Sequence, residues 1–446
     1  MERTLIKNLN ECKGGEVTIN GIVDVARDQG KMAFFDFRDR SGKVQGVVFG
    51  KPEVLEIAKT LRPESAVAIT GIVNERPEKM RKEGVQNGDI ELEITAIKIL
   101  NLAEVLPFEL DADTSLETVL DNRPLTLKSK RSQDIFKVAA TIVQAYREAL
   151  ITDEFVEFQA PAITGGDAEG GAEVFKIEYF KERTANLATS PQLYKEIMTG
   201  AFERAFTIAK IFRAEKSATT RHLSEVTQMD FEMGFINDHH DVMEELERVI
   251  RFVCGKVTEK HHDVFARFET TAPLLPDGKF PTLTLLEAQK ILDESYGTSC
   301  SGDPDLEPEH ERQICDWAKK EHGSDFVFIT EFPTAKRAFY TYPDPENPER
   351  SRSFDLLFRG LEINSGSQRF HDYHEMVMTL KARGLDPEKF AFYLMLHKYG
   401  APPHGGCSTG LERITARMLE LPNVKEAVPF PRDINRIDTL LYKAEE

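Results

Sequence analysis

The sequence of 446 residues contains no uninterrupted run of eighteen apolar residues, so it predicts no membrane-spanning helix. No apolar signal core follows the charged start at residues 1–4, and we expect a cytoplasmic protein. Cysteine is scarce, because the sequence holds five scattered residues and no Cys-x-x-Cys pair. This pattern argues against a disulfide-stapled secreted domain and against a structural zinc site.

Positive charge is also in short supply. The formal net charge is −18, which argues against a protein that is basic throughout. Residues 1–104, however, hold 16 Lys and Arg against 17 Asp and Glu, and the remainder of the chain carries a net charge of −17. A nearly neutral region can present a local basic face, which is sufficient for a specific nucleic-acid contact.

The first hundred residues show five β-rich segments with a helical segment, 52–61, after the third. This order is typical of an OB barrel, and we assign it to a domain at 1–104. Such barrels bind single-stranded nucleic acid through a basic groove and aromatic stacking platforms. The predicted strands are 16–26, 31–40, 42–49, 66–74 and 88–101.

Phe34, Phe35 and Phe37 lie within four positions of the second predicted strand. Because side chains alternate along a strand, the three rings cannot all point into the barrel. Phe34 or Phe35 is therefore predicted to be a stacking platform, with Arg27 and Gln45 beside it on the ligand-facing side. The alternative is that Phe34 belongs to the barrel core.

A second domain is predicted at 131–446, after a proline-containing acidic segment at 105–130 that suggests a linker or hinge. Its first element is a long amphipathic helix that leads into a strand at 155–161. Periodicity does not distinguish a helix that forms a dimer from a plain core helix, because both bury one face.

A loop crowded with charge lies between two apolar segments of this domain. It holds Arg213, Glu215, Arg221 and His222, followed by Leu223. Such a cluster at a hairpin tip can hold a polyanion such as a nucleoside triphosphate. The alternative is a salt-bridged surface hairpin.

A glycine-rich run, 405–410, opens a further helical pattern. Small residues allow the backbone to approach a ligand closely. Arg413 falls in the first helical turn, where a basic residue opposes the helix dipole, so it is predicted to have a specific anionic or aromatic partner.

The charged loop and the glycine-rich run resemble the second and third signature motifs of class II aminoacyl-tRNA synthetases. The flanking residues resemble the aspartyl/asparaginyl branch in its archaeal and eukaryotic form, and the resemblance covers nearly the whole chain. It implies an α+β fold, with an N-terminal OB barrel and a catalytic domain built on an antiparallel sheet flanked by helices. It also implies ATP-dependent attachment of L-aspartate to tRNA(Asp) through an aspartyl-adenylate, by a homodimer.

The resemblance assigns roles in ATP binding. Arg213 and Arg413 would be the catalytic arginines, the first on the α-phosphate and the substrate carboxylate, the second stacked on adenine. Val226 stands where many relatives carry an aromatic residue, so adenine would be held less tightly. The implied ATP-binding residues are Arg213, Glu215, Arg221, His222, Leu223, Glu362 and Arg413.

Three oxygen-bearing residues, Asp355, Glu362 and Ser365, offer the hard ligands that Mg²⁺ prefers. The resemblance implies that Glu362 and Ser365 hold Mg²⁺ between the α- and β-phosphates of ATP, with Asp355 as an auxiliary ligand. Asp355 alone could equally be a salt-bridged strand carboxylate.

Substrate choice depends on Lys195 and Arg369, which could pair with the anionic aspartate side chain in a buried site. Asparagine would leave Lys195 unpaired, which argues against the alternative of an asparaginyl-tRNA synthetase. Glu169 lies in a glycine-rich segment that resembles the flipping loop of the family, although an ordinary turn has the same composition. The implied aspartate-binding residues are Glu169, Gln192, Lys195, Asp230, Ser365 and Arg369.

The resemblance also implies that the barrel binds the tRNA anticodon through Arg27, Phe34, Gln45 and Pro77. Ile22 stands where relatives restricted to one tRNA often carry tryptophan, and this favours charging of tRNA(Asn) as well. Two other protein classes remain. A regulatory protein on a degenerate synthetase core would have lost some of the key arginines and glutamates, and an amide-forming ligase would normally lack the barrel.

Overall fold

The computed structural model describes residues 2–112, 114–166, 173–216 and 219–437. The chain divides into two compact units, Met1–Ala112 and Asp113–Glu446. The segment 105–130, expected to be a linker, spans this boundary and contains two short helices, α2 (Leu116–Asp121) and α3 (Arg123–Thr126). Within the described ranges, no helix is both long and apolar enough to cross a bilayer.

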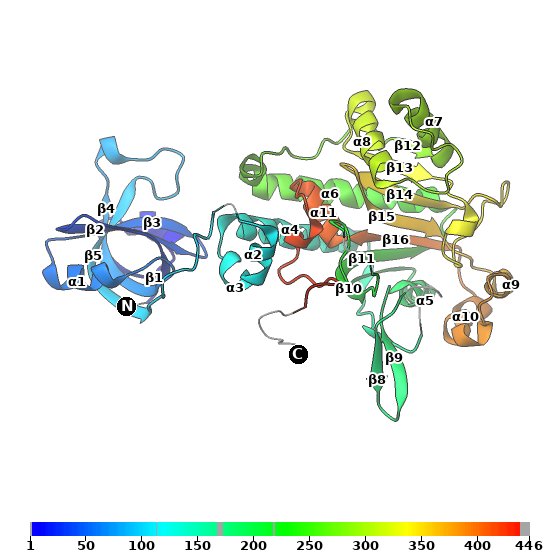
Figure 1. Ribbon diagram of the computed structural model, residues 1–446, viewed down its shortest axis with the longest axis horizontal. Coiled ribbons are helices and arrows are strands. Elements are labelled where there is room, and N and C mark those ends of the chain that lie inside the picture. The colour runs from blue at the N-terminus through cyan, green and yellow to red at the C-terminus, as the bar shows by residue number, and fades with distance from the viewer. Residues whose placement is uncertain (1, 113, 167–172, 217–218, 438–446) are drawn as a thin grey trace. The chain divides into compact units, whose positions relative to one another are not determined.

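The first unit is a closed barrel with the strand order β1-β2-β3-β5-β4, drawn in blue in Figure 1. Helix α1 (Pro52–Thr60) follows the third strand, as predicted, and a 3₁₀ helix, η1 (Ile6–Cys12), precedes the first. The predicted OB barrel is thereby confirmed. The strands are β1 (Glu16–Asp28), β2 (Met32–Asp39), β3 (Gly42–Phe49), β4 (Ala66–Glu75) and β5 (Ile90–Asn101).

Alternation along β2 decides which phenylalanines fill the barrel. Phe35 and Phe37 are buried, with ring centroids 5.5 Å apart, whereas Phe34 points outward and is half-buried. Phe34 is therefore the ring available for stacking, and Phe35 belongs to the core.

The second unit is built on an eight-stranded sheet in the order β12-β13-β14-β15-β16-β11-β10-β6. Neighbouring strands are antiparallel except for two parallel pairs, β12 with β13 and β6 with β10. The strands are β6 (Val156–Glu157), β10 (Arg204–Phe212), β11 (Glu225–Gly234), β12 (Thr282–Thr284), β13 (Phe326–Thr330), β14 (Ser353–Phe358), β15 (Leu361–Gln368) and β16 (His404–Gly410).

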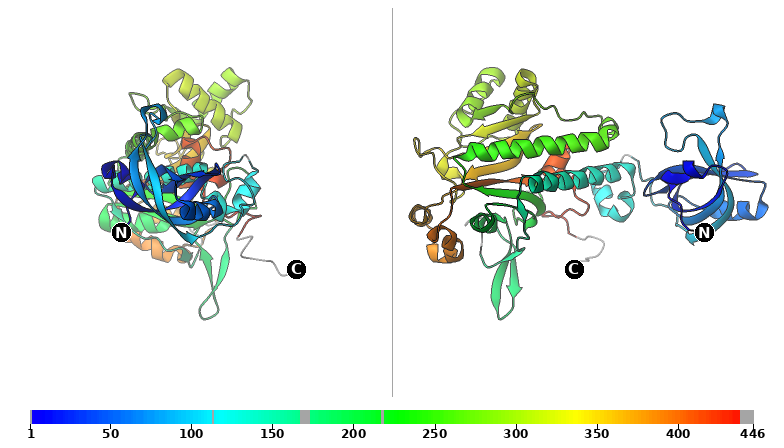
Figure 2. Two further views of the ribbon diagram at one scale, coloured as in Figure 1. Left: turned by 90° about the vertical axis from the view of Figure 1, so that its left-hand side faces the viewer. Right: turned by 180° about the vertical axis from the view of Figure 1, so that it is seen from behind.

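Two long helices, α4 (Lys130–Thr152) and α6 (His239–Arg267), lie side by side along this sheet (Figures 1 and 2). Their apolar stripes and the buried side of the sheet form one hydrophobic cluster, in which Tyr146 also donates a hydrogen bond to the Met229 carbonyl, 3.0 Å away. The predicted antiparallel sheet flanked by helices is confirmed.

Smaller elements complete the second unit. A three-stranded sheet, β7-β9-β8, forms beside the large one, and its β8–β9 hairpin projects in Figure 1. These strands are β7 (Ile163–Thr164), β8 (Lys176–Tyr179) and β9 (Arg183–Leu187). The remaining α-helices are α5 (Gln192–Phe202), α7 (Leu285–Tyr296), α8 (Pro308–His322), α9 (Tyr373–Ala382), α10 (Ala391–Lys398) and α11 (Leu411–Met418).

Candidate active site

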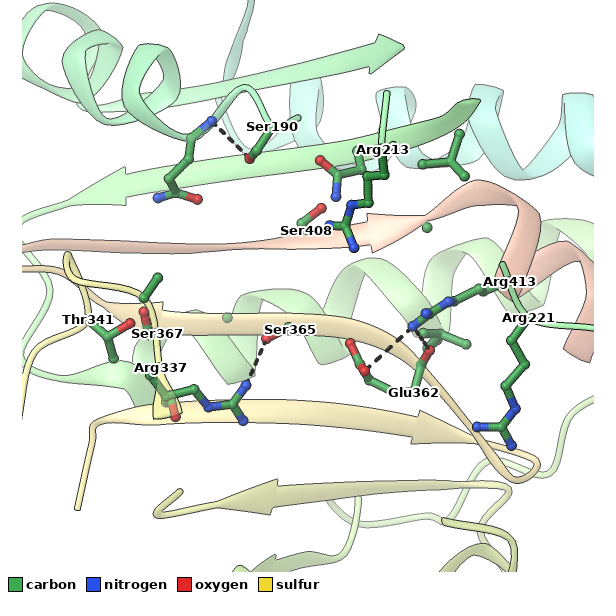
Figure 3. Close-up of a pocket in the computed structure, with 18 of the residues that line it drawn as sticks. Ser190, Arg213, Arg221, Arg337, Thr341, Glu362, Ser365, Ser367, Ser408 and Arg413 are labelled. Atoms are coloured by element: carbon green, nitrogen blue, oxygen red, sulfur yellow. Dashed lines mark hydrogen bonds and ion pairs between the residues drawn. The ribbon is translucent and has the colours of Figure 1, made fainter. Parts of the chain in front are cut away.

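A cavity of about 360 Å³ lies on the large sheet of the second unit. Its lining comes mainly from β11, β15 and β16, from the loop between β10 and β11, from the segment 336–341, and from the starts of α5 and α11 (Figure 3). Ten predicted site residues line it: Gln192, Arg213, Glu215, Arg221, His222, Leu223, Glu362, Ser365, Arg369 and Arg413. Lys195, Asp230 and Asp355 are buried behind its wall, and Glu169 falls outside the described residues.

The charged loop is positioned by the antiparallel pair β10–β11, whose last matched residues are Phe212 and Glu225. Arg213 follows β10 directly, and its Nη1 lies 3.8 Å from Oε1 of Glu215. The other carboxylate oxygen of Glu215 is 3.9 Å from Nε2 of His222. A guanidinium, a carboxylate and an imidazole are thus gathered at the cavity, as the sequence predicts.

Arg221 is held by a helix whose role the sequence did not reveal. Its Nη1 donates to Oε2 of Glu311 on α8 at 2.7 Å, and its Nη2 donates to the Gly360 carbonyl at 3.1 Å. Burial raises the pKa of Glu311, although the charge of Arg221 opposes this. Gly360 has a φ of +79° in the β14–β15 turn, a conformation that favours glycine.

Arg413 lies in the first turn of α11, where it faces β15 (Figure 3). Its Nη1 donates to the Glu362 carbonyl at 2.9 Å and lies 3.5 Å from the Glu362 carboxylate. Burial raises the pKa of Glu362 to about 7, and Arg413 opposes the rise. The partner that the sequence predicts for Arg413 is therefore, in part, a carboxylate of the protein itself.

A β-bulge explains how Glu362 and Ser365 both come to line the cavity. Residues three apart on a regular strand point to opposite faces. In the β14–β15 pair, Leu356 matches Asn364 while Leu357 matches Glu362, so Ile363 has no opposite residue. This extra residue shifts the alternation of side chains along β15 by one position, so that Glu362 and Ser365 both face the cavity.

Asp355 lies opposite Ser365 in the same strand pair, but its carboxylate is already paired with an arginine. Arg337 donates from Nη2 to Oδ2 of Asp355 at 2.8 Å, and its Nη1 lies 3.5 Å from Oγ of Ser365. The other Asp355 oxygen, Oδ1, has no hydrogen-bond partner among the described residues. Arg337 lines the cavity without having been predicted, because no recognisable motif surrounds it.

Lys195 is wholly buried between two carboxylates. Its Nζ lies 3.0 Å from Oδ2 of Asp230 and 3.3 Å from Oε2 of Glu232, and it donates to the Cys407 carbonyl at 3.0 Å. Ser408, from β16, donates to the other Asp230 oxygen at 2.7 Å. Lys195 therefore lies beneath the cavity rather than at its surface, and because Asp230 and Glu232 already pair with it, the expectation that asparagine would leave it unpaired is wrong.

Arg369 shares Glu232 with Lys195. Its Nε donates to Oε1 of Glu232 at 2.9 Å, and its Nη2 donates to the Gly406 carbonyl at 2.9 Å. Burial alone would lower the pKa of Arg369, but Glu232 raises it. Glu232 was missed although Asp230 was predicted, and their spacing of two on one strand is the signal that could have found it.

The predicted anticodon residues of the first unit share an outward face. Arg27 is matched with Phe34 across β1–β2, and Asp36, two positions further on, is matched with Gln45 across β2–β3. Arg27 pairs with Asp36 at 3.1 Å, and Oε1 of Gln45 accepts from Arg76 at 2.8 Å. Pro77 is exposed in the loop after β4.

Comparisons with known proteins agree with both units. Residues 115–434 match the family of class II tRNA synthetases (D, K and N), and residues 17–100 match the OB-fold nucleic acid binding domain. The chain is 40% identical over 439 residues to the aspartate–tRNA(Asp/Asn) ligase of Thermus thermophilus, covering 98% of this chain and 99% of that one. It is 38% identical to the aspartate–tRNA(Asp) ligase of Thermococcus kodakarensis, covering 96% and 97%.

A solved structure supports the same assignment. The asparaginyl-tRNA synthetase of Pyrococcus horikoshii complexed with asparaginyl-adenylate has a TM-score of 0.88 and 30% identity, covering 98% of this chain and 99% of that one. The resemblance stated from the sequence is confirmed: the chain belongs to the class II tRNA synthetases that comprise the aspartate, lysine and asparagine enzymes.

Proposed function

We propose that this chain is an aspartate–tRNA ligase, which activates L-aspartate with ATP and transfers it from aspartyl-adenylate to tRNA(Asp). One observation carries the proposal: two buried cations stand at the end of the cavity that we assign to the amino acid, Arg369 in its lining and Lys195 behind its wall. The names of the relatives, aspartate–tRNA(Asp/Asn) and aspartate–tRNA(Asp) ligases, support the same substrate.

Charge balance allows this cluster to accept the anionic side chain of aspartate. Lys195 and Arg369 offset Asp230 and Glu232, so the cluster of these four is neutral before a substrate enters. Arg369 lines the cavity and can bind a carboxylate through two N–H groups. Without Lys195 the cluster would carry a net negative charge and would repel an anionic side chain.

In the first step, a carboxylate oxygen of aspartate attacks the α-phosphorus of ATP. The bond from that phosphorus to the β-phosphate oxygen breaks, and pyrophosphate leaves. Arg213 would stabilise the charge on the α-phosphate and hold the attacking carboxylate, while Arg221 and His222 hold the γ-phosphate. Arg413 would stack on adenine, Glu215 would accept from the adenine amino group, and Leu223 would pack beside it.

The oxygen ligands present fit Mg²⁺. Glu362 and Ser365 line the cavity with a carboxylate and a hydroxyl, and the unpartnered Oδ1 of Asp355 is an auxiliary donor behind them. Bound there, the ion would neutralise phosphate charge as pyrophosphate forms. Arg337 lies beside the same oxygens and would add a fixed positive charge.

In the second step, a terminal ribose hydroxyl of tRNA attacks the acyl carbon of aspartyl-adenylate, and AMP leaves. The outward face of the barrel would bind the anticodon, with Phe34 stacking on a base, Gln45 hydrogen-bonding to one, and Arg27 and Pro77 flanking them. Arg76 holds Oε1 of Gln45, so the Gln45 amide is already oriented.

The tRNA range is tested by charging purified tRNA(Asp) and tRNA(Asn) transcripts side by side with labelled aspartate and with labelled asparagine. Following Ile22 and the name of the Thermus relative, we expect aspartate on both transcripts. Aspartate on tRNA(Asp) alone would show a discriminating enzyme and would contradict the inference from Ile22. Asparagine on tRNA(Asn) would overturn the aspartate assignment.

We also infer a homodimer acting in the cytoplasm. The strand β6 lies at one end of the large sheet, directly after the long helix α4, and this helix–strand pair resembles the first signature motif of the family, which forms the dimer interface. Sedimentation that finds a fully active monomer would contradict the dimer.

A further inference from the structure

A buried polar network lies directly behind the amino-acid end of the cavity. Glu196 on α5 is one helical turn after Gln192, and its side chain is wholly buried. Oε1 of Glu196 accepts from Nε2 of Gln192 at 2.7 Å. Oε2 accepts from the Tyr393 hydroxyl of α10 at 2.6 Å and faces Nε2 of His404 on β16 at 3.2 Å.

With Glu196 ionised, the geometry around His404 favours a proton on both ring nitrogens. Nδ1 lies 2.8 Å from the Pro402 carbonyl oxygen, and Nε2 faces the Glu196 carboxylate. A neutral ring would direct a lone pair at one of these oxygens in a site from which water is excluded. Burial alone would lower the pKa of His404, but the contact with Glu196 raises it. Burial likewise would raise the pKa of Glu196, yet His404 lowers it to about 2.

The same residues could suggest a metal site, because ligand atoms of Glu196, His397 and His404 lie within 4.8 Å of one another. Protein groups already use those atoms, however. Both Glu196 oxygens accept hydrogen bonds, both His404 nitrogens face acceptors, and Nε2 of His397 lies 3.1 Å from the Phe370 carbonyl. The Glu196 oxygens and the His404 nitrogens are therefore satisfied, whereas Nδ1 of His397 is buried without a hydrogen-bond partner among the described residues.

The network sets the orientation of one cavity residue. Since Nε2 of Gln192 donates to Glu196, the amide oxygen Oε1 points the other way, where Nη2 of Arg369 lies 3.5 Å from it. Gln192 lines the cavity. An amide oxygen presented there can accept a hydrogen bond from a substrate ammonium, whereas an amide nitrogen would oppose it.

We propose that Glu196 is a positioning residue for the amino-acid substrate: clamped by His404 and Tyr393, it fixes the Gln192 amide with its oxygen toward the substrate ammonium. This inference rests on the proposed function, because it assigns that end of the cavity to aspartate. Glu196 need not touch the substrate, and it acts through Gln192.

The test is E196Q, which keeps the shape of the side chain and removes its charge. Two donors, Tyr393 and His404, face the Oε2 position, so the new amide oxygen settles there and its NH₂ group faces Gln192. The Gln192 amide must then turn over and present its own NH₂ group to the substrate. In aspartate-dependent pyrophosphate exchange we expect KM for aspartate to rise about tenfold or more, with KM for ATP nearly unchanged.

A matched control is D134N, which makes the same kind of change at another buried, ion-paired carboxylate. Asp134 on α4 is bound by Lys130 at 2.6 Å and Arg267 at 2.7 Å, away from the cavity lining. We expect D134N to lower stability and to leave both KM values unchanged. If E196Q does not fold, H404Q serves instead, because it removes the charge that clamps Glu196 and should raise KM for aspartate selectively.

Equal rises in both KM values, or none, would overturn the role of Glu196. Wild-type protein that does not exchange pyrophosphate with aspartate would instead contradict the proposed function, so the two failures are distinguishable.

Discussion

Lys195 holds a positive charge where water does not reach, between Asp230 and Glu232. The change K195M keeps the length of the side chain and leaves both carboxylates without this partner. We expect kcat/KM for aspartate in pyrophosphate exchange to fall at least ~30-fold, because an uncompensated buried charge would repel the substrate.

The control for Lys195 is K210M, since Lys210 pairs with Glu225 at 3.3 Å on a half-exposed surface. Surface pairs of this kind contribute little, so its kinetics should match the wild type. Unchanged aspartate activation in K195M would show that Lys195 is not needed for substrate choice.

His404 provides a pH test. Its pKa is raised above the ordinary 6.5 by Glu196, in spite of burial, so the imidazolium stabilises the folded protein fully below pH 6.5. This contribution is lost as the pH rises through the folded-state pKa. We expect H404Q to lower Tm by roughly 2–4 °C near neutral and mildly acidic pH, and by less in alkaline solution.

Trp317, the one tryptophan, lies on α8 and reports the unfolding of the second unit by fluorescence. A Tm difference between wild type and H404Q that stays constant or grows with pH would contradict a protonated His404.

Helix α8 is the element that connects Arg221 to the rest of the fold. If Glu311 positions Arg221 for the γ-phosphate, E311Q should raise KM for ATP about tenfold and leave KM for aspartate unchanged. Glu309 on the same helix is exposed and pairs with Arg312, so E309Q is the matched control. A lower KM for ATP in E311Q would mean that Glu311 competes with phosphate for Arg221.

Strand β2 presents Phe34 on the outward face of the barrel. Stacking on one base contributes roughly 1–3 kcal/mol, so F34A should lower kcat/KM for tRNA charging ~10-fold or more without changing pyrophosphate exchange. Ile57, exposed on helix α1, offers the control I57A. Equal charging by F34A and wild type would exclude Phe34 as the stacking platform.

At the scale of the whole molecule, each of the two units has its own hydrophobic core. Residues 113–446 produced alone should therefore fold and retain aspartate-dependent pyrophosphate exchange, while tRNA charging falls ~100-fold or more with the anticodon contacts. Loss of pyrophosphate exchange in a folded fragment would show that the barrel contributes to the chemistry.

Local patterns made much of this architecture predictable. The barrel strands followed from period-two alternation, and the β10–β11 hairpin followed from apolar segments around a charged loop. Arg213, Arg221 and Arg413 were found because each stands within a short motif. Glu311 and Arg337 were not found, because each reaches the cavity from a segment without a recognisable motif.

By itself the sequence determined the two-unit plan, the charged loop and the identity of the family, because these depend on residues close together in the chain. Only the tertiary structure decided which phenylalanine faces outward and how an unmatched residue, Ile363, lets Glu362 and Ser365 share one cavity. It alone placed Glu196 against His404, since the two are 208 positions apart and meet where α5 packs against β16. Alternation and motifs act over a few residues, whereas a buried charge network depends on packing between distant elements, which no local pattern encodes.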